Sequence, residues 1–285
     1  MSATADQLRN RVSGVPAVAG LDVRRAAVAA ALVGACIALG YALRLSADAY
    51  LLVGIPITVA FQALVARQPL RSLWLRAAPD LAFTPRSIAA VAVLSVAPAA
   101  LALTGLRSGD LVRASYGTVG IVGAFGAMYA MRAMDRSAVR AAARAAAIGS
   151  AAMVSVMVAL RLATGGFHGD VVPALAAAAV SLATYLPVVF VMEEVLFRGA
   201  IDPYVAGTEA RPGRASAVFG SALWGLWHLP VAGFSLGLAT VPYLVGIHVL
   251  LGSLLVAAWR RTGNLAAPGI AHAVIDAVRN GVAVL

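Results

Sequence analysis

The sequence predicts an all-α protein, a polytopic bundle of about eight or nine transmembrane helices. Hydrophobic residues make up 61% of the 285 residues and charged residues only 12%, whereas a soluble domain carries about a quarter charged residues. Long apolar runs recur along the chain, and roughly 20 apolar residues suffice to cross a bilayer as a helix. Arginine-rich and arginine-poor segments alternate between these runs. All three observations indicate a membrane protein.

Nine apolar runs are candidate spans, and some of them are short. They cover residues 26–43, 49–66, 87–105, 115–131, 145–160, 171–192, 215–234, 241–259 and 265–284. The polar segments between them are too short for a separate soluble domain. In the fourth run, Gly117, Gly120, Gly123 and Gly126 recur every three residues, which predicts a smooth ridge for close helix packing.

The distribution of arginine predicts the topology. Arginines are frequent in the N-terminal tail, in segments 67–86, 132–144 and 198–214, and at 260–261. Because cytoplasmic loops carry the excess of basic residues, we expect a multi-pass plasma-membrane protein with a cytoplasmic N-terminus. Because the arginines cluster between apolar runs, we attribute the net charge of +10 to the topology of the chain in the lipid bilayer. We do not expect a nucleic-acid partner. The oligomeric state is not indicated.

Ionisable residues are concentrated in the last four spans. Placing one such side chain inside a membrane costs roughly several kcal/mol, so we expect these residues to pair or to perform chemistry. The stretch "EEVLFR" contains two of the three glutamates of the chain. Glu194 and Arg198 are one helical turn apart and can form an ion pair, which is a structural explanation for both. Glu193 is rotated by about 100° from Glu194 and lacks this partner. A desolvated carboxylate is a candidate for general acid–base chemistry.

Two further stretches place polar residues one helical turn apart. In "WGLWH", Trp224 and His228 share a face, and in "HAVID", His272 and Asp276 do so. The second spacing suits either a histidine oriented by a carboxylate or two metal ligands. His248 has no polar partner at i+4, and we interpret it as a packing or hydrogen-bonding residue.

"EEVLFRG", "WGLWH" and "HAVID" occur in the order of three family motifs, EExxxR, FxxxH and HxxxN. Over roughly residues 180–280, the chain resembles the CAAX-processing and bacteriocin-processing intramembrane endopeptidases, the CPBP or Abi-type family. The resemblance implies that Glu193 is the water-activating base, assisted by Glu194 and held by Arg198. It implies that His228 and His272 bind a metal or stabilise the oxyanion. Asp276 stands where the family usually has Asn, and Trp224 replaces Phe at a packing position.

The resemblance therefore implies an intramembrane endopeptidase that acts on a membrane-associated or lipidated protein or peptide. A divalent metal such as zinc, held by Glu193, His228, His272 and Asp276, and a glutamate–histidine mechanism both remain open. A catalytically silent relative with an immunity or scaffold role is the alternative function, and a transporter is a further one. The implied organisation is an N-terminal tail at 1–25, scaffold helices at 26–170 and catalytic helices at 171–285.

The positions of the motifs relative to the polar turns make a geometric prediction. Glu193 and His228 lie at similar distances from the turn near residue 210, so antiparallel helices bring them to similar depth. We expect Pro203 to end the sixth span early, which also shifts the level of Glu193. Glu193, His228 and His272 should then converge in one polar cavity that opens towards the cytoplasmic, arginine-rich side.

Overall fold

A computed structural model describes residues 21–77, 79–207, 213–232 and 239–285. The described part of the chain is helical, and its only β contact is an isolated bridge between Leu75 and Asn264. The predicted all-α class is confirmed. The predicted tail, 1–25, lies outside the described residues up to residue 20.

Two of the described elements have the wider π-helical turn, η1 and η3, and η2 is a short 3-10 helix. The elements are α2 Val23–Leu43, α3 Ala47–Ala60, η1 Phe61–Ala66, η2 Leu70–Leu73, α4 Pro85–Ser108, α5 Leu111–Met131, α6 Arg136–Ala163, α7 Val171–Val189, η3 Val195–Ile201, α8 Asp202–Ala206, α9 Arg214–Trp227, α10 Thr240–Thr262 and α11 Ala266–Val284.

Seven helices of the described part are long and apolar enough to cross a membrane: α2, α3 with η1, α4, α5, α6, α7 and α10. The polytopic helical bundle is therefore confirmed, with seven such helices against the eight or nine spans expected. The predicted spans 215–234 and 265–284 correspond to α9 and α11. The first is only 14 residues long, and the second carries Asp276 and Arg279.

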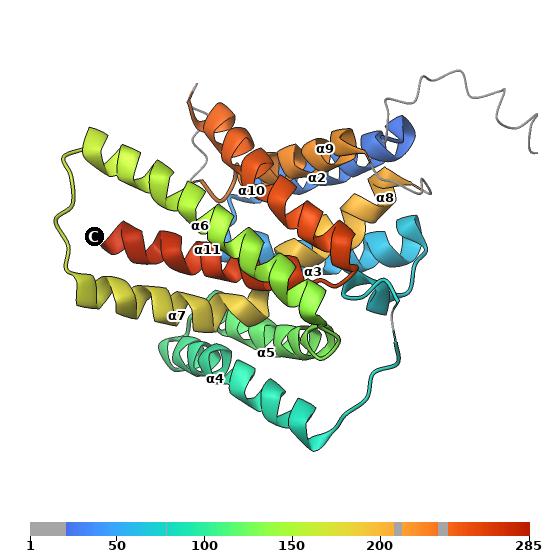
Figure 1. The fold of residues 1–285 in the computed structure, drawn as a ribbon, viewed down its shortest axis with the longest axis horizontal. Coiled ribbons are helices and arrows are strands. Elements are labelled where there is room, and N and C mark those ends of the chain that lie inside the picture. Colours follow the sequence, from blue (N-terminus) through green and yellow to red (C-terminus); the bar gives the residue numbers. More distant parts are fainter. Residues whose placement is uncertain (1–20, 78, 208–212, 233–238) are drawn as a thin grey trace, which may run out of the picture.

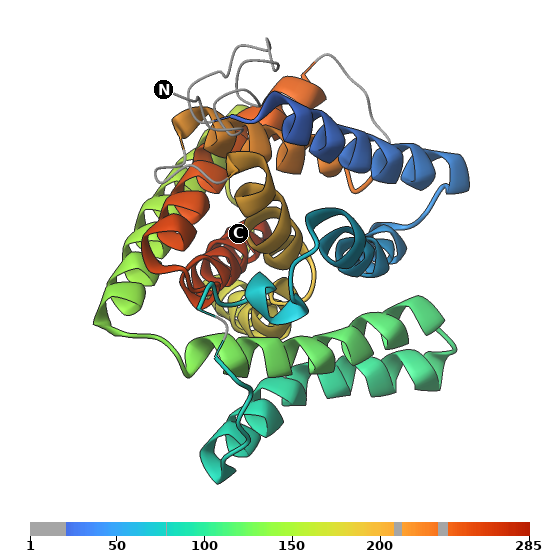
Figure 2. The same cartoon turned by 90° about the vertical axis from the view of Figure 1, so that its right-hand side faces the viewer.

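The bundle surrounds α11 and η3. α11 packs between α6 and α7, α10 packs against α9, and α4 pairs with α5 along one side (Figure 1). Every residue of η3 is buried, and the element runs through the middle of the bundle (Figure 2). The motif-bearing helices therefore meet in the interior and not at a lipid-facing surface.

The glycine ridge of α5 brings three helices close together, as predicted. A Cβ at Gly117 would collide with backbone atoms of α4, and one at Gly123 would collide with the carbonyl oxygen of Pro187 in α7. A step of three residues rotates the ridge by roughly 60° per glycine, so it turns from one neighbour to the next. At Gly126, the last glycine of the ridge, a Cβ would collide with the Trp74 indole.

The helix before the glutamates ends earlier than expected. α7 stops at Val189, and a turn formed by residues 190–192 precedes Glu193. Pro187 lacks a backbone N–H and its carbonyl accepts from the Phe190 N–H at 3.2 Å, which closes the last turn. Pro203 does not end the span, because it lies at the start of α8. The break therefore comes before the two glutamates.

The arginine-rich segments meet at one end of the bundle. Arg260 forms an ion pair with Asp202 at 2.5 Å, and the Arg76 N–H donates to the Gly263 carbonyl at 2.9 Å. Arg25 Nη1 donates to the Tyr204 carbonyl at 3.3 Å. The start of α2, the stretch around Arg76, α8 and the end of α10 thus lie at one end of the bundle.

Candidate active site

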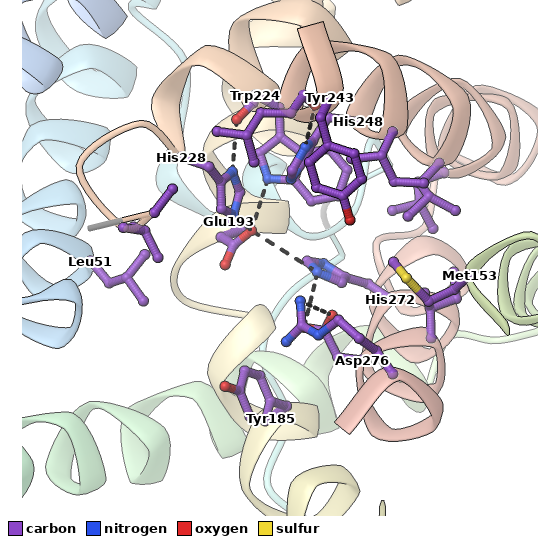
Figure 3. A pocket seen from close by; sticks show the side chains of 18 residues that line it. Leu51, Met153, Tyr185, Glu193, Trp224, His228, Tyr243, His248, His272 and Asp276 are labelled. Carbon is purple, nitrogen blue, oxygen red and sulfur yellow. Dashed lines mark hydrogen bonds and ion pairs between the residues drawn. The ribbon is translucent and has the colours of Figure 1, made fainter. Parts of the chain in front are cut away.

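The Glu193 carboxylate faces two histidines in the interior of the bundle. Its Oε2 lies 3.4 Å from His228 Nε2 and 4.0 Å from His272 Nε2. The three side chains come from the α7–η3 junction, the end of α9 and α11, and Figure 3 shows Glu193 between the two rings. The predicted convergence of Glu193, His228 and His272 is confirmed.

Glu194 connects the "EEVLFR" motif with His272 of the "HAVID" motif. It is completely buried, and its Oε1 lies 3.0 Å from Arg198 Nη1 and 2.9 Å from His272 Nδ1. The i,i+4 ion pair with Arg198 forms as the helical spacing predicts, even though the wider turn of η3 begins at residue 195. Wider turns of this kind occur frequently at functional sites. One carboxylate therefore both balances a buried guanidinium and orients a histidine.

Trp224 has more than a packing role. Its Nε1–H donates to Glu193 Oε2 at 2.8 Å, and the Arg198 guanidinium lies over its ring at 4.0 Å from the centroid. A phenylalanine, which stands here in the family pattern, has no such donor. Trp224 thus links the ion pair of Glu194 and Arg198 to the orientation of Glu193.

The hydrogen bonds fix which nitrogen each histidine presents to Glu193. His228 Nδ1 donates to the Trp224 carbonyl at 2.8 Å, because a carbonyl oxygen can only accept. His272 Nδ1 faces the carboxylate of Glu194, which also pairs with Arg198, so we assign the proton of this contact to Nδ1. Both rings therefore carry the proton on Nδ1, and both Nε2 atoms face the Glu193 side of the site.

Asp276 and Arg279 continue the site along α11. Asp276 Oδ2 lies 3.4 Å from His272 Nε2, and its Oδ1 lies 3.1 Å from Arg279 Nη1. Carboxylates on both sides of the His272 ring favour its doubly protonated form, since both nitrogens can then donate. Asp276 therefore acts as a charge partner here, which an asparagine would not do.

His248 packs and forms a hydrogen bond, as interpreted from the sequence, and it does so next to the site. Its ring centroid lies 4.2 Å from that of His228 and 4.5 Å from that of Trp224. Its Nδ1 donates to the Leu244 carbonyl at 2.7 Å. The contact joins two different helices, so no spacing within one motif indicates it.

A cavity of about 250 Å³ contains these groups. Beyond the polar cluster its walls are apolar, and they include Leu51 at the start of α3, Val231 after α9 and Leu244 near the start of α10. These positions lie towards the end of the bundle opposite the arginine-rich segments. The cavity therefore occupies the half of the bundle away from the arginine-rich segments, which the positions of the polar turns did not indicate. Its opening towards the arginine-rich side stays a prediction.

A metal ion implied by the family resemblance would be held by Glu193, His228, His272 and Asp276. The donor types suit a divalent cation, since both Nε2 atoms lie near the two carboxylates. As they are arranged, however, no group of three or more His, Cys, Asp and Glu side chains in the described ranges is spaced to hold an ion. A shared metal position requires these side chains to move.

The structure brings all six predicted site residues together. Glu193, Glu194, Arg198, His228, His272 and Asp276 form one chain of contacts of 4.0 Å or less. Trp224 as a donor, His248 and Arg279 extend the site beyond the residues predicted to act in it.

The fold and the site define a polytopic helical membrane protein with a glutamate–histidine centre in its interior. Residues 173–278 match the family model described as Type II CAAX prenyl endopeptidase Rce1-like. The match includes all six predicted site residues, and it confirms the family resemblance predicted from the three motifs. It supports an intramembrane protease of the CAAX type. No curated protein and no solved structure gives a significant match to the chain.

Proposed function

We propose that this protein is an intramembrane endopeptidase that hydrolyses a peptide bond in a membrane-associated or lipidated substrate. One observation carries this proposal. Glu193 Oε2 faces the Nε2 atoms of both His228 and His272 inside a cavity, and all three residues lie in the family-matched region. A carboxylate in this position can deprotonate a water molecule that lies between the three groups.

Glu193 is the general base in this mechanism. It takes a proton from water while the water oxygen bonds to the scissile carbonyl carbon, and the carbonyl oxygen becomes an oxyanion. The protonated Glu193 then gives this proton to the leaving amine as the C–N bond breaks. The Trp224 hydrogen bond holds the carboxylate in place during both transfers.

His272 is the better oxyanion donor of the two histidines. Its Nδ1 contacts Glu194 and its Nε2 contacts Asp276, so it can carry both protons and donate from Nε2. His228 presents Nε2 to the water that Glu193 activates. Buried, oriented donors of this kind contribute on the order of 10²–10³-fold each to the rate.

A metal-assisted mechanism is the second proposal for the same site. A divalent ion such as zinc, held by Glu193, His228, His272 and Asp276, would polarise the water and the carbonyl when bound. With Asp276 in place of the usual asparagine, the site has one more carboxylate, which raises its affinity for a divalent cation. Elemental analysis of the purified protein and of Asp276→Asn tests this. Full activity in metal-free protein contradicts the metal proposal, and loss of a bound ion in Asp276→Asn supports it.

The activity is tested with a farnesylated peptide that ends in Cys-Val-Ile-Met. The purified protein should cleave it, whereas Glu193→Gln, His228→Ala and His272→Ala should each lose cleavage and keep their helical circular dichroism. Asp80→Asn is the matched control, because this carboxylate is exposed and outside the site. Persistent cleavage by Glu193→Gln removes Glu193 as the base.

The natural substrate is identified in cells. Membrane proteomes of cells that carry the protein and of cells that carry Glu193→Ala should differ in one or a few processed chain ends. Identical proteomes would instead favour a silent, scaffold-type relative.

We also propose that the N-terminus is cytoplasmic, in the plasma membrane. The contacts among the arginine-rich segments support one shared side for them. Single cysteines at Gln68 and Ala133 should be labelled from the cytoplasm, and one at Thr164 from outside, in a Cys36→Ser background. Labelling of Gln68 and Ala133 from opposite sides contradicts the topology.

A further inference from the structure

A groove of about 870 Å³ lies between the first half of α4 and the end of α5, apart from the active-site cavity. Its walls are largely apolar and include Ala90, Val93 and Leu94 of α4 and Met128 and Met131 of α5. Val93 is 72% exposed, and Figures 1 and 2 both show the start of α4 at the outer edge of the bundle. Because α4 and α5 are long and apolar enough to cross a membrane, this groove faces lipid.

Two arginines stand at one end of the groove. α4 and α5 pack together and are joined by only two residues, so the start of α4 lies beside the end of α5. Arg86 is in the first turn of α4, and Arg132 directly follows α5. Val93 lies seven residues further along α4 than Arg86, or about 10 Å of helix rise. The groove therefore has a cationic end and an apolar length.

Neither arginine forms an ion pair with a carboxylate in the described part of the chain. Arg132 donates through Nη1 to the Ala82 carbonyl at 3.0 Å and through Nη2 to the Asp80 backbone carbonyl. These acceptors carry no net charge, and N–H groups of the guanidinium remain for a ligand. The Asp80 carboxylate pairs with Arg71 instead, at 2.7 Å. Arg86 is exposed and has no hydrogen bond or ion pair with the described residues.

We propose that this groove binds one anionic phospholipid, with the phosphate at Arg86 and Arg132 and an acyl chain along the apolar wall. Guanidinium groups bind phosphate through paired N–H···O hydrogen bonds. Basic pockets between membrane helices bind the headgroups of anionic lipids in other proteins. A zwitterionic lipid gains less from the two arginines, because its headgroup carries its own cation. The inference is independent of the proposed endopeptidase activity, since the groove and the active-site cavity share no lining residue.

The first experiment measures lipid binding to the purified full-length protein in a neutral detergent by native mass spectrometry. The probes are phosphatidylglycerol and phosphatidylcholine with the same acyl chains. Phosphatidylglycerol should bind roughly 30-fold more tightly, since each arginine near the headgroup contributes about fivefold. Arg86→Gln should reduce this preference to roughly fivefold. The double variant Arg86→Gln/Arg132→Gln should abolish it.

The matched control is Arg140→Gln, which removes an exposed arginine near the start of α6, outside the groove. It should keep the preference for phosphatidylglycerol. Arg86→Gln is the more direct test, because Arg132 also holds two backbone carbonyls. Equal binding of the two lipids by the parent protein overturns the proposal, and so does a preference that survives the double variant. An equal loss in Arg140→Gln also overturns it, because diffuse surface charge would then explain the preference.

The second experiment locates the acyl chain. Ala90→Phe should lower the affinity for phosphatidylglycerol by at least about tenfold, because the ring occupies the space of the chain. Ala100→Phe is the control, since Ala100 is exposed on the same helix and lies outside the groove. Unchanged binding in Ala90→Phe overturns the assignment of the lipid to this groove. Excess glycerol phosphate, which has no acyl chain, should not displace the lipid. Displacement would assign the arginines to a free phosphate ligand and overturn the proposal.

Discussion

Breaking the buried ion pair between Glu194 and Arg198 should destabilise the protein strongly, whereas removing both charges should not. The two side chains are 0% and 1% exposed, and their charged atoms are 3.0 Å apart. Arg198→Met leaves the Glu194 carboxylate buried with His272 as its remaining partner. Loss of one member of a buried pair costs roughly 3–5 kcal/mol.

The double variant Glu194→Gln/Arg198→Met should recover most of this loss. Replacing a buried pair by neutral groups of similar volume is close to neutral, so we expect stability within roughly 1–2 kcal/mol of the parent. Its activity should not recover, because His272 loses the negative charge at Nδ1. We expect kcat at least about 10²-fold below the parent, by analogy with removal of an orienting carboxylate from a catalytic histidine.

The assay is unfolding at rising mole fractions of sodium dodecyl sulfate, followed by circular dichroism, together with peptide cleavage for the same proteins. The double-mutant cycle isolates the coupling between the two residues. If the double variant is as unstable as the sum of the two single variants, the pair is not a coupled unit. If it regains full activity, Glu194 does not orient His272.

Two further outcomes are expected. Trp224→Phe should fold normally but lower kcat by roughly 10- to 100-fold, because Glu193 loses a charge-assisted hydrogen bond of roughly 1.5–3 kcal/mol; an unchanged kcat would mean that this bond does not position the base. Gly123→Ala should reduce the free energy of unfolding by roughly 1–3 kcal/mol, since its Cβ meets the Pro187 carbonyl. Gly34→Ala, with no atom within 4 Å of the added carbon, is its control and should not destabilise the protein.

The predictions that succeeded depend on local helix geometry and on apolar composition. The ion pair of Glu194 and Arg198 follows from i,i+4 spacing, and the ridge around Gly123 follows from small residues at regular intervals. The order of the three motifs, read through the family resemblance, placed Glu193 with His228 and His272. Each of these inferences uses a constraint that is present within one helix or in a known set of motifs.

The missed features depend on how helices rotate against one another. The Trp224–Glu193 hydrogen bond joins residues 31 apart, and the His228–His248 contact joins the end of α9 to the interior of α10. The half of the bundle that contains the cavity is likewise set by the starts of α3 and α10 and not by the motifs. The periodicity of a sequence shows which residues share one face of a helix. It does not show which other helix that face contacts.

The contact between Glu194 and His272 has a consequence for how the chain is made. These residues are separated by 78 positions, so His272 leaves the ribosome long after Glu194. Until then the Glu194–Arg198 pair has no histidine beside it, and the segment that carries it is poorly soluble in lipid. α11, which is synthesised later, thus completes the environment of the Glu194–Arg198 pair. Final assembly must therefore follow insertion of the whole C-terminal region, and a chain truncated before α11 would present an incompletely satisfied charge pair to the quality-control proteases of the membrane.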